Sequence, residues 1–175
     1  DDRFGPRFAE NAARFHGARH HFIFHHGMGH VPTDVAPDVR SRSYTIEAHV
    51  EIEEAGASGV LISHGDATSG YSLYIKDGHL VHDLNIGGSH QIVRSDRKVL
   101  GAQRLGVHVE RLVRKEAPAK GSRTGITEYT LLIDGEKAGS LQTQLGFHTL
   151  ISWSGLDIGR DRGSPVSHYE SPFEF

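Results

Sequence analysis

The stretch Tyr71-Ser72-Leu73-Tyr74-Ile75-Lys76-Asp77-Gly78-His79-Leu80-Val81-His82-Asp83-Leu84-Asn85-Ile86 decides the fold class. Two short runs rich in aliphatic and aromatic residues flank an Asp-Gly pair, which accepts the positive backbone angles of a tight turn at low cost. Runs of this length joined by such a turn predict an antiparallel hairpin. A second pair, Asp134-Gly135, separates residues 126–133 from residues 136–143 and predicts a second hairpin.

The rest of the chain continues this pattern. From Tyr44 to Ile52, apolar and polar side chains alternate, which predicts a long half-buried strand. Because no amphipathic helical pattern lies between the strand segments, a βαβ architecture is disfavoured. The sequence predicts an all-β protein, an antiparallel β-sandwich of the jelly-roll or concanavalin/laminin-G type. Further strands are expected at Gly59–His64, Gln91–Arg94, Leu105–Leu112 and Gly155–Arg160.

Residues 1–42 differ from the remainder and predict an irregular N-terminal arm. Phe8–Phe15 favours a short helix, and Pro32 and Pro37 indicate an extended connector after it. We expect this arm and the sandwich, residues 43–175, to form one unit, because 175 residues suit a single domain. Lys115–Gly125 is expected to be an exposed hairpin loop.

Composition excludes several classes of function. The 19 basic and 22 acidic side chains give a formal charge of −3, which disfavours a nucleic-acid partner. The absence of cysteine rules out disulfides, thiolate metal sites and a cysteine nucleophile. No apolar run approaches the roughly 20 residues that span a bilayer, so we expect a soluble chain without a membrane partner, in a compartment that the sequence leaves open.

Histidine is abundant, with 14 in all, and imidazole is a common metal ligand. His25, His26 and His30 in the arm, with Asp157 and Asp161 near the C-terminus, are the candidate metal ligands. The arm histidines match no tight ligand spacing, and adjacent strand side chains point to opposite faces. A solvent-facing or hydrogen-bonded role is therefore favoured for them, and no cofactor is expected in this chain.

The sequence offers residues for two further kinds of site, a hydrolase triad and a carbohydrate-binding rim. Hydrolase triads would need Ser63, His64 and Asp66, or Ser152, Ser154 and Asp157, but sequence neighbours do not supply the required geometry. Sandwich rims also bind sugars, so Trp153 and Tyr71 as stacking surfaces, with Arg160 as a polar contact, are the candidate carbohydrate-binding residues. The sequence thus predicts no catalytic residue and leaves glycan binding as an alternative.

Seven segments, each a generic turn or strand by itself, form a recognisable series through their order and spacing. They are Asp1–Phe4, Phe22–Met28, Ala36–Ile46, Gly59–Ile62, Gly70–Gly78, Ile133–Lys137 and Gly155–Ser167. This series resembles the C-terminal region of large bacterial arylsulfatases, and the likeness covers nearly the whole chain. It implies a sandwich that packs on or beside a sulfatase domain, and it leads us to expect that the chain is part of a longer polypeptide.

The resemblance also implies where catalysis would occur. Members of the family hydrolyse sulfate esters with a formylglycine made in a C/S-x-P-x-R motif, supported by calcium that acidic side chains hold. This chain has no cysteine, and no serine is followed by x-Pro-x-Arg. The expectation is a non-catalytic accessory domain whose main partner is the upstream sulfatase domain of the same polypeptide, with Phe22, Phe24 and Met28 in the interdomain contact.

Overall fold

The computed structural model describes residues 10, 14, 16–113, 125–145, 151–170 and 173–175. Every pair of neighbouring strands in this part of the chain is antiparallel. The strands are β1 (Tyr44–Ile52), β2 (Gly59–Asp66), β3 (Ser69–Lys76), β4 (His79–Ile86), β5 (Ser89–Lys98), β6 (Gly101–Val113), β7 (Gly125–Ile133), β8 (Glu136–Thr143), β9 (Leu156–Ile158), β10 (Arg160–Asp161) and β11 (Phe173–Glu174).

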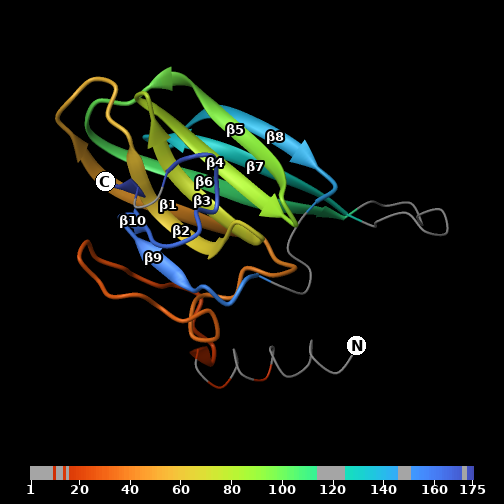
Figure 1. The fold of residues 1–175 in the computed structure, drawn as a ribbon. Helices are drawn as coiled ribbons and strands as arrows, with labels where there is room; N and C mark the ends of the chain where they lie inside the picture. Colours follow the sequence, from red (N-terminus) through yellow and green to blue (C-terminus); the bar gives the residue numbers. More distant parts are fainter. Residues whose placement is uncertain (1–9, 11–13, 15, 114–124, 146–150, 171–172) are drawn as a thin grey trace.

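Two sheets lie face to face and form the sandwich (Figure 1). One has four strands in the order β1-β6-β7-β8, and the other has five in the order β5-β4-β3-β2-β9. The predicted all-β antiparallel sandwich is confirmed. No described helix is long and apolar enough to cross a membrane.

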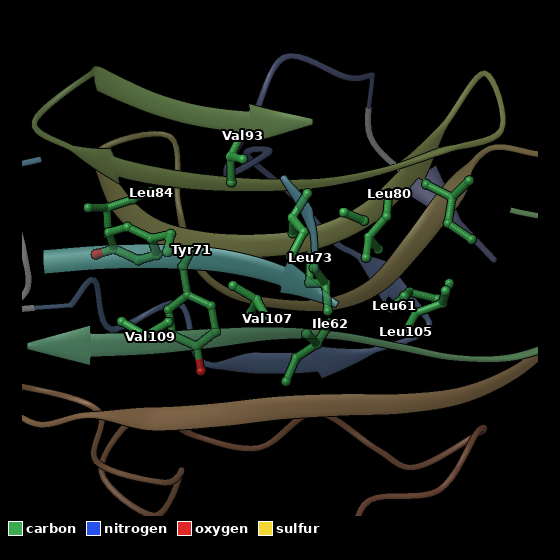
Figure 2. Close-up of a cluster of buried hydrophobic side chains, with 14 of the residues drawn as sticks. Leu61, Ile62, Tyr71, Leu73, Leu80, Leu84, Val93, Leu105, Val107 and Val109 are labelled. Atoms are coloured by element: carbon green, nitrogen blue, oxygen red, sulfur yellow. The ribbon is translucent and has the colours of Figure 1, made fainter. Parts of the chain in front are cut away.

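The main core fills the space between the sheets (Figure 2). Strand periodicity explains its composition, since successive side chains point to opposite faces. Leu73 on β3 and Leu84 on β4 meet Leu105 and Val107 on β6, and all four are fully buried. In β1 the half-buried positions alternate with exposed ones, as the sequence predicts.

The Asp-Gly turns adopt the expected conformation. Asp77 and Gly78 have φ angles of 53° and 76°, and Asp134 and Gly135 have 53° and 84°. Positive φ at both central residues matches the right-handed twist of the flanking strands, so each turn closes its hairpin without splaying it. A further tight turn, Gly87-Gly88 between β4 and β5, was not predicted.

Some boundaries differ from the sequence predictions. The strand expected over Gly155–Arg160 is interrupted at Gly159, where φ is 69°, so β9 pairs with β2 whereas β10 pairs with β11. The predicted helix over Phe8–Phe15 lies mostly outside the described residues, of which Glu10 and Arg14 are helical. The predicted loop Lys115–Gly125 also lies outside them, except that Gly125 begins β7.

The C-terminal segment covers the outer face of the five-stranded sheet, the face that points away from the main core. Tyr169 and Phe173 pack on Tyr74 of β3, and Val60 and Val81 complete this second apolar cluster. Side chains that would otherwise meet solvent on this face are therefore buried, which creates a layer outside the sandwich proper.

Candidate functional site

Most of the candidate residues gather where the N-terminal arm meets β9. The backbone N–H of Val31 donates to Leu156 O at 2.9 Å, and the N–H of Leu156 donates to Val31 O at 2.7 Å. Arg160 Nη2 donates to Met28 O at 2.9 Å. These bonds fix the arm along the outer edge of the five-stranded sheet, where Figure 1 shows it beside β9.

His30 and Asp157 are brought together at this junction. His30 Nδ1 lies 3.3 Å from Asp157 Oδ1, and Asp157 is almost fully buried. The imidazole of His30 lies against Gly155, where an ideal Cβ would stand 2.3 Å from Nε2. Only glycine at position 155 leaves room for this ring, so the close approach holds the arm to the loop before β9.

The remaining metal candidates do not converge with this pair. His26 lies beside Gly159, whereas His25 is exposed and its backbone N–H contacts Met28 Sδ. Asp161 belongs to the C-terminal layer, where it accepts hydrogen bonds from the Tyr169 hydroxyl and the Val166 N–H. Burial raises the pKa of Asp161, against the effect of these two bonds. Within the described ranges, no three His, Asp or Glu side chains are grouped to hold a metal ion.

Thr33 of the arm connects three elements through one hydroxyl. It donates to Ser152 O at 2.8 Å and accepts from the N–H of Gly155 at 3.0 Å. Since the only hydrogen of this hydroxyl is used, His64 Nε2 at 3.3 Å acts as a donor to it. This assigns the Nε2–H tautomer to His64 and leaves its buried Nδ1 without a hydrogen-bond partner in the described part of the chain.

His64 is unsuited to be a general base for any of the candidate serines. Burial, with the positive charges of Arg40 and His30, lowers the pKa of His64 to about 4, although Asp38 opposes the shift. Ser63 lies on the opposite face of β2, where its hydroxyl donates to Arg160 O. Ser63 and His64, which the sequence analysis disfavoured as members of a triad with Asp66, thus have other hydrogen-bond partners in the described structure.

The second serine group is built around Asp66 instead of Asp157. Ser152 and Ser154 both donate their hydroxyls to Asp66 Oδ2, and Thr68 donates to Oδ1. Burial acts to raise the pKa of Asp66, but these hydrogen bonds outweigh that effect and hold the pKa well below its usual range. Neither serine has an imidazole partner among the described contacts, and their hydrogen bonds to Asp66 fix the loop before β9.

The candidate carbohydrate-binding residues differ in exposure, and the burial of Tyr71 corrects its assignment as a stacking surface. Trp153 is 60% exposed at the tip of the loop that Asp66 holds. Tyr71 is only 1% exposed, because the alternation of β3 points its ring into the core, as Figure 2 shows. Arg160 donates to Met28 O, and its buried Nε has no hydrogen-bond partner among the residues that the structure describes. Of the three residues, only Trp153 offers a stacking surface.

Sequence reasoning missed a polar cluster in the C-terminal layer. Asp83 on β4 is fully buried, and its Oδ2 accepts hydrogen bonds from His90 Nδ1 on β5 and from the Ser167 hydroxyl, each at 2.6 Å. The hydroxyl oxygens of Tyr74 and Ser167 are hydrogen-bonded to each other at 3.1 Å. The alternation of β4 places Asp83 opposite to the core-facing Leu84, but nothing in the sequence showed that residues 160–170 cover it.

Comparisons with known proteins identify no family for this chain. No family model and no curated protein match it. Among solved structures, it is similar to the heptameric SAP-like pentraxin from Limulus polyphemus, with a TM-score of 0.42 and 17% sequence identity over 76% of this chain. The chain spans 58% of the length of that pentraxin chain.

Proposed function

We propose that this chain is a non-catalytic accessory domain of an arylsulfatase-like sulfuric ester hydrolase, which packs against and stabilises a sulfatase domain in the same polypeptide. The observation that carries the proposal is the fixed arm. Residues 28–33 are hydrogen-bonded to β9 and to the loop before it, which fixes this part of the arm at one edge of the sandwich and supports packing of an upstream domain there. The resemblance to arylsulfatase C-terminal regions supplies the identity of that domain.

Exposed apolar side chains on this side of the sandwich support the packing. Ile23 in the arm is 67% exposed and Trp153 is 60% exposed. Phe22 and Phe24, which the sequence suggested for the interface, are half-buried instead, with Phe22 against His16 and Phe24 against the main core. We therefore assign the interdomain contact to Ile23 and Trp153, with Phe24 as an internal anchor of the arm.

The first test is the complete product of the gene. Its reading frame should encode a C/S-x-P-x-R motif upstream, and the whole product should hydrolyse a chromogenic aryl sulfate in the presence of calcium. The 175-residue chain alone should be inactive under the same conditions. An upstream sequence without a sulfatase domain, or turnover by the isolated chain in proportion to its concentration, would contradict the proposal.

The interface itself is tested by Ile23→Asp in both forms. In the whole product the substitution should cost about 2 kcal/mol of stability, the value of burying one such side chain. In the isolated chain it should change the unfolding midpoint little, because the side chain is already exposed. Leu100→Asp is the matched control, since Leu100 is 55% exposed in the turn between β5 and β6 and should be neutral in both forms.

A second candidate function is glycan binding through Trp153, favoured by the exposure of this indole on a loop held by Asp66. Trp153→Ala should then weaken retention on a sulfated or plain polysaccharide column, whereas Leu100→Ala should not. If the isolated chain is not retained on any such column, or if Trp153→Ala is retained as strongly as the native chain, glycan binding is excluded as its role.

A further inference from the structure

The outer face of the five-stranded sheet carries two histidines in contact. His90 lies on β5 and His168 in the C-terminal segment, and their ring centroids are 4.1 Å apart with planes inclined at 37°. The pair is remote along the sheet from the arm and β9, because β5 and β9 are the two outer strands of that sheet. It is thus independent of the junction between the arm and β9.

The carboxylate of Asp83 orients the first histidine. Its Oδ2 accepts the Nδ1 hydrogen of His90 at 2.6 Å, and the buried Ser167 hydroxyl donates to the same oxygen. A carboxylate at Nδ1 leaves the lone pair of Nε2 available and makes that nitrogen a better ligand, as in many metal-bound histidines. The side chain of His90 is 19% exposed, so the ring is held from within the protein and reaches solvent.

The second histidine, His168, is held in place through its backbone carbonyl and through its two neighbours in the chain. Lys76 Nζ donates to His168 O at 3.0 Å, and the buried neighbours Ser167 and Tyr169 are each hydrogen-bonded to the sheet. The imidazole of His168 itself is exposed. Within the described part of the chain, no hydrogen bond occupies Nε2 of His90 or either ring nitrogen of His168.

A second observation points to a bound cation. Asp83 is 0% exposed, and its Oδ1 has no hydrogen-bond partner among the described residues. Neither a lysine nor an arginine is paired with this carboxylate in the described chain. A buried carboxylate with so little compensation is costly, and positive charge placed on the imidazole that it contacts reduces that cost.

We propose that His90 and His168 form a two-histidine site for a divalent transition metal, with Asp83 as the positioning residue. Imidazole ligands suit copper, nickel and zinc, and affinity for such a site rises toward Cu²⁺. Metal–nitrogen bonds of about 2.1 Å place two ligating nitrogens about 3 Å apart. Rings that already lie 4.1 Å apart reach this arrangement by rotation of the exposed His168 side chain. Water or an external ligand completes the coordination.

The test is a Cu²⁺ titration of the 175-residue chain, followed by calorimetry and by histidine resonances in NMR spectra. One equivalent should bind, and His90 and His168 should broaden first at substoichiometric Cu²⁺. His90→Gln and His168→Gln should each weaken binding at least about tenfold. His168→Gln is the safer variant, since it alters an exposed ring and leaves the Asp83 hydrogen bonds in place.

The matched control replaces His25 and His26 in the arm, the adjacent exposed pair, with glutamine. This double variant should retain the one-equivalent site. Three outcomes would overturn the assignment and show adventitious binding. The arm histidines could broaden first, binding could be lost only in the arm variant, or the affinity could be equal in all variants. None of these outcomes depends on the accessory-domain proposal.

Discussion

Histidines on the inner and outer faces of the five-stranded sheet have opposite surroundings. On the inner face, His82 is fully buried and stacked between the rings of Tyr71 and Tyr129, and neither of its nitrogens has a hydrogen-bond partner among the described residues. On the outer face, His90 is paired with a buried carboxylate and reaches solvent. His82 and Asp83 are neighbours on β4, so a single step along the strand separates an imidazole packed between aromatic rings from a carboxylate that orients another imidazole.

The largest expected effect is a loss of folding stability in acid, caused by the buried histidines His64 and His82. Burial lowers the pKa of His82 to about 3 and, with nearby positive charges, that of His64 to about 4, both from 6.5. The unfolded chain therefore binds two protons that the folded chain excludes. The stabilisation that depends on these two neutral histidines is fully present above about pH 6.5 and is lost as the pH falls toward 4. In that range the equilibrium constant for unfolding should rise about a hundredfold for each pH unit lost.

Urea denaturation at a series of pH values measures this slope. His82→Leu, which keeps an apolar side chain between the two tyrosines, should halve the slope on a logarithmic scale by removing one of the two protons. A slope that is the same in the variant and the native chain would show that His82 is not buried in its neutral form.

On the outer face, Asp83→Ala should have the next largest effect. The substitution leaves the His90 Nδ1–H and the Ser167 hydroxyl without their acceptor, which should cost about 2 kcal/mol. Chemical denaturation at neutral pH measures the loss. Asp83→Asn, which keeps an acceptor oxygen, should cost less, and equal stability of all three proteins would show that the cluster contributes nothing to the fold.

A smaller effect is expected for Ser167→Ala. One of the two hydrogen bonds to Asp83 is lost together with the contact to Tyr74, which should cost about 1 kcal/mol. Ser164→Ala is the control, because Ser164 is exposed in the same segment. Thermal unfolding of the two variants side by side should separate them, and identical midpoints would contradict the buried position of Ser167.

The smallest effect on stability should come from His168→Gln, because its ring is exposed and makes no side-chain hydrogen bond within the described residues. Its unfolding free energy should stay within about 0.5 kcal/mol of the native value. A large loss of stability would mean that the contact with His90 is structural, and the comparison between the two faces would need to be redrawn.

Alternation and turn chemistry made the sandwich predictable from sequence. The period-two pattern from Tyr44 to Ile52 and the turns at Asp77 and Asp134 are local features, and local sterics decide them. The faces that a strand presents follow from the same period, which is sufficient to put Leu73 in the core.

The positions of functional side chains were less predictable because distant segments decide them. Tyr74 points away from the main core, as a sugar platform would, yet Tyr169 and Phe173 cover it. Likewise, the pairing of Asp83 with His90 was not predictable, since it depends on the register between β4 and β5 and on Ser167 from the C-terminal segment. A strand pattern specifies two faces but not which of them another segment will bury.

The pairing of β2 with β9 also has a consequence for synthesis on the ribosome. β2 lies between β3 and β9, and β9 in turn is closed by Val31 of the arm. Until residues 156–158 emerge from the exit tunnel, β2 remains an open edge and the arm has nothing to bind. Contacts between such distant parts of a chain form slowly, and an unpaired edge can recruit other nascent chains. The period before residues 156–158 become available is therefore when this domain is most prone to aggregate.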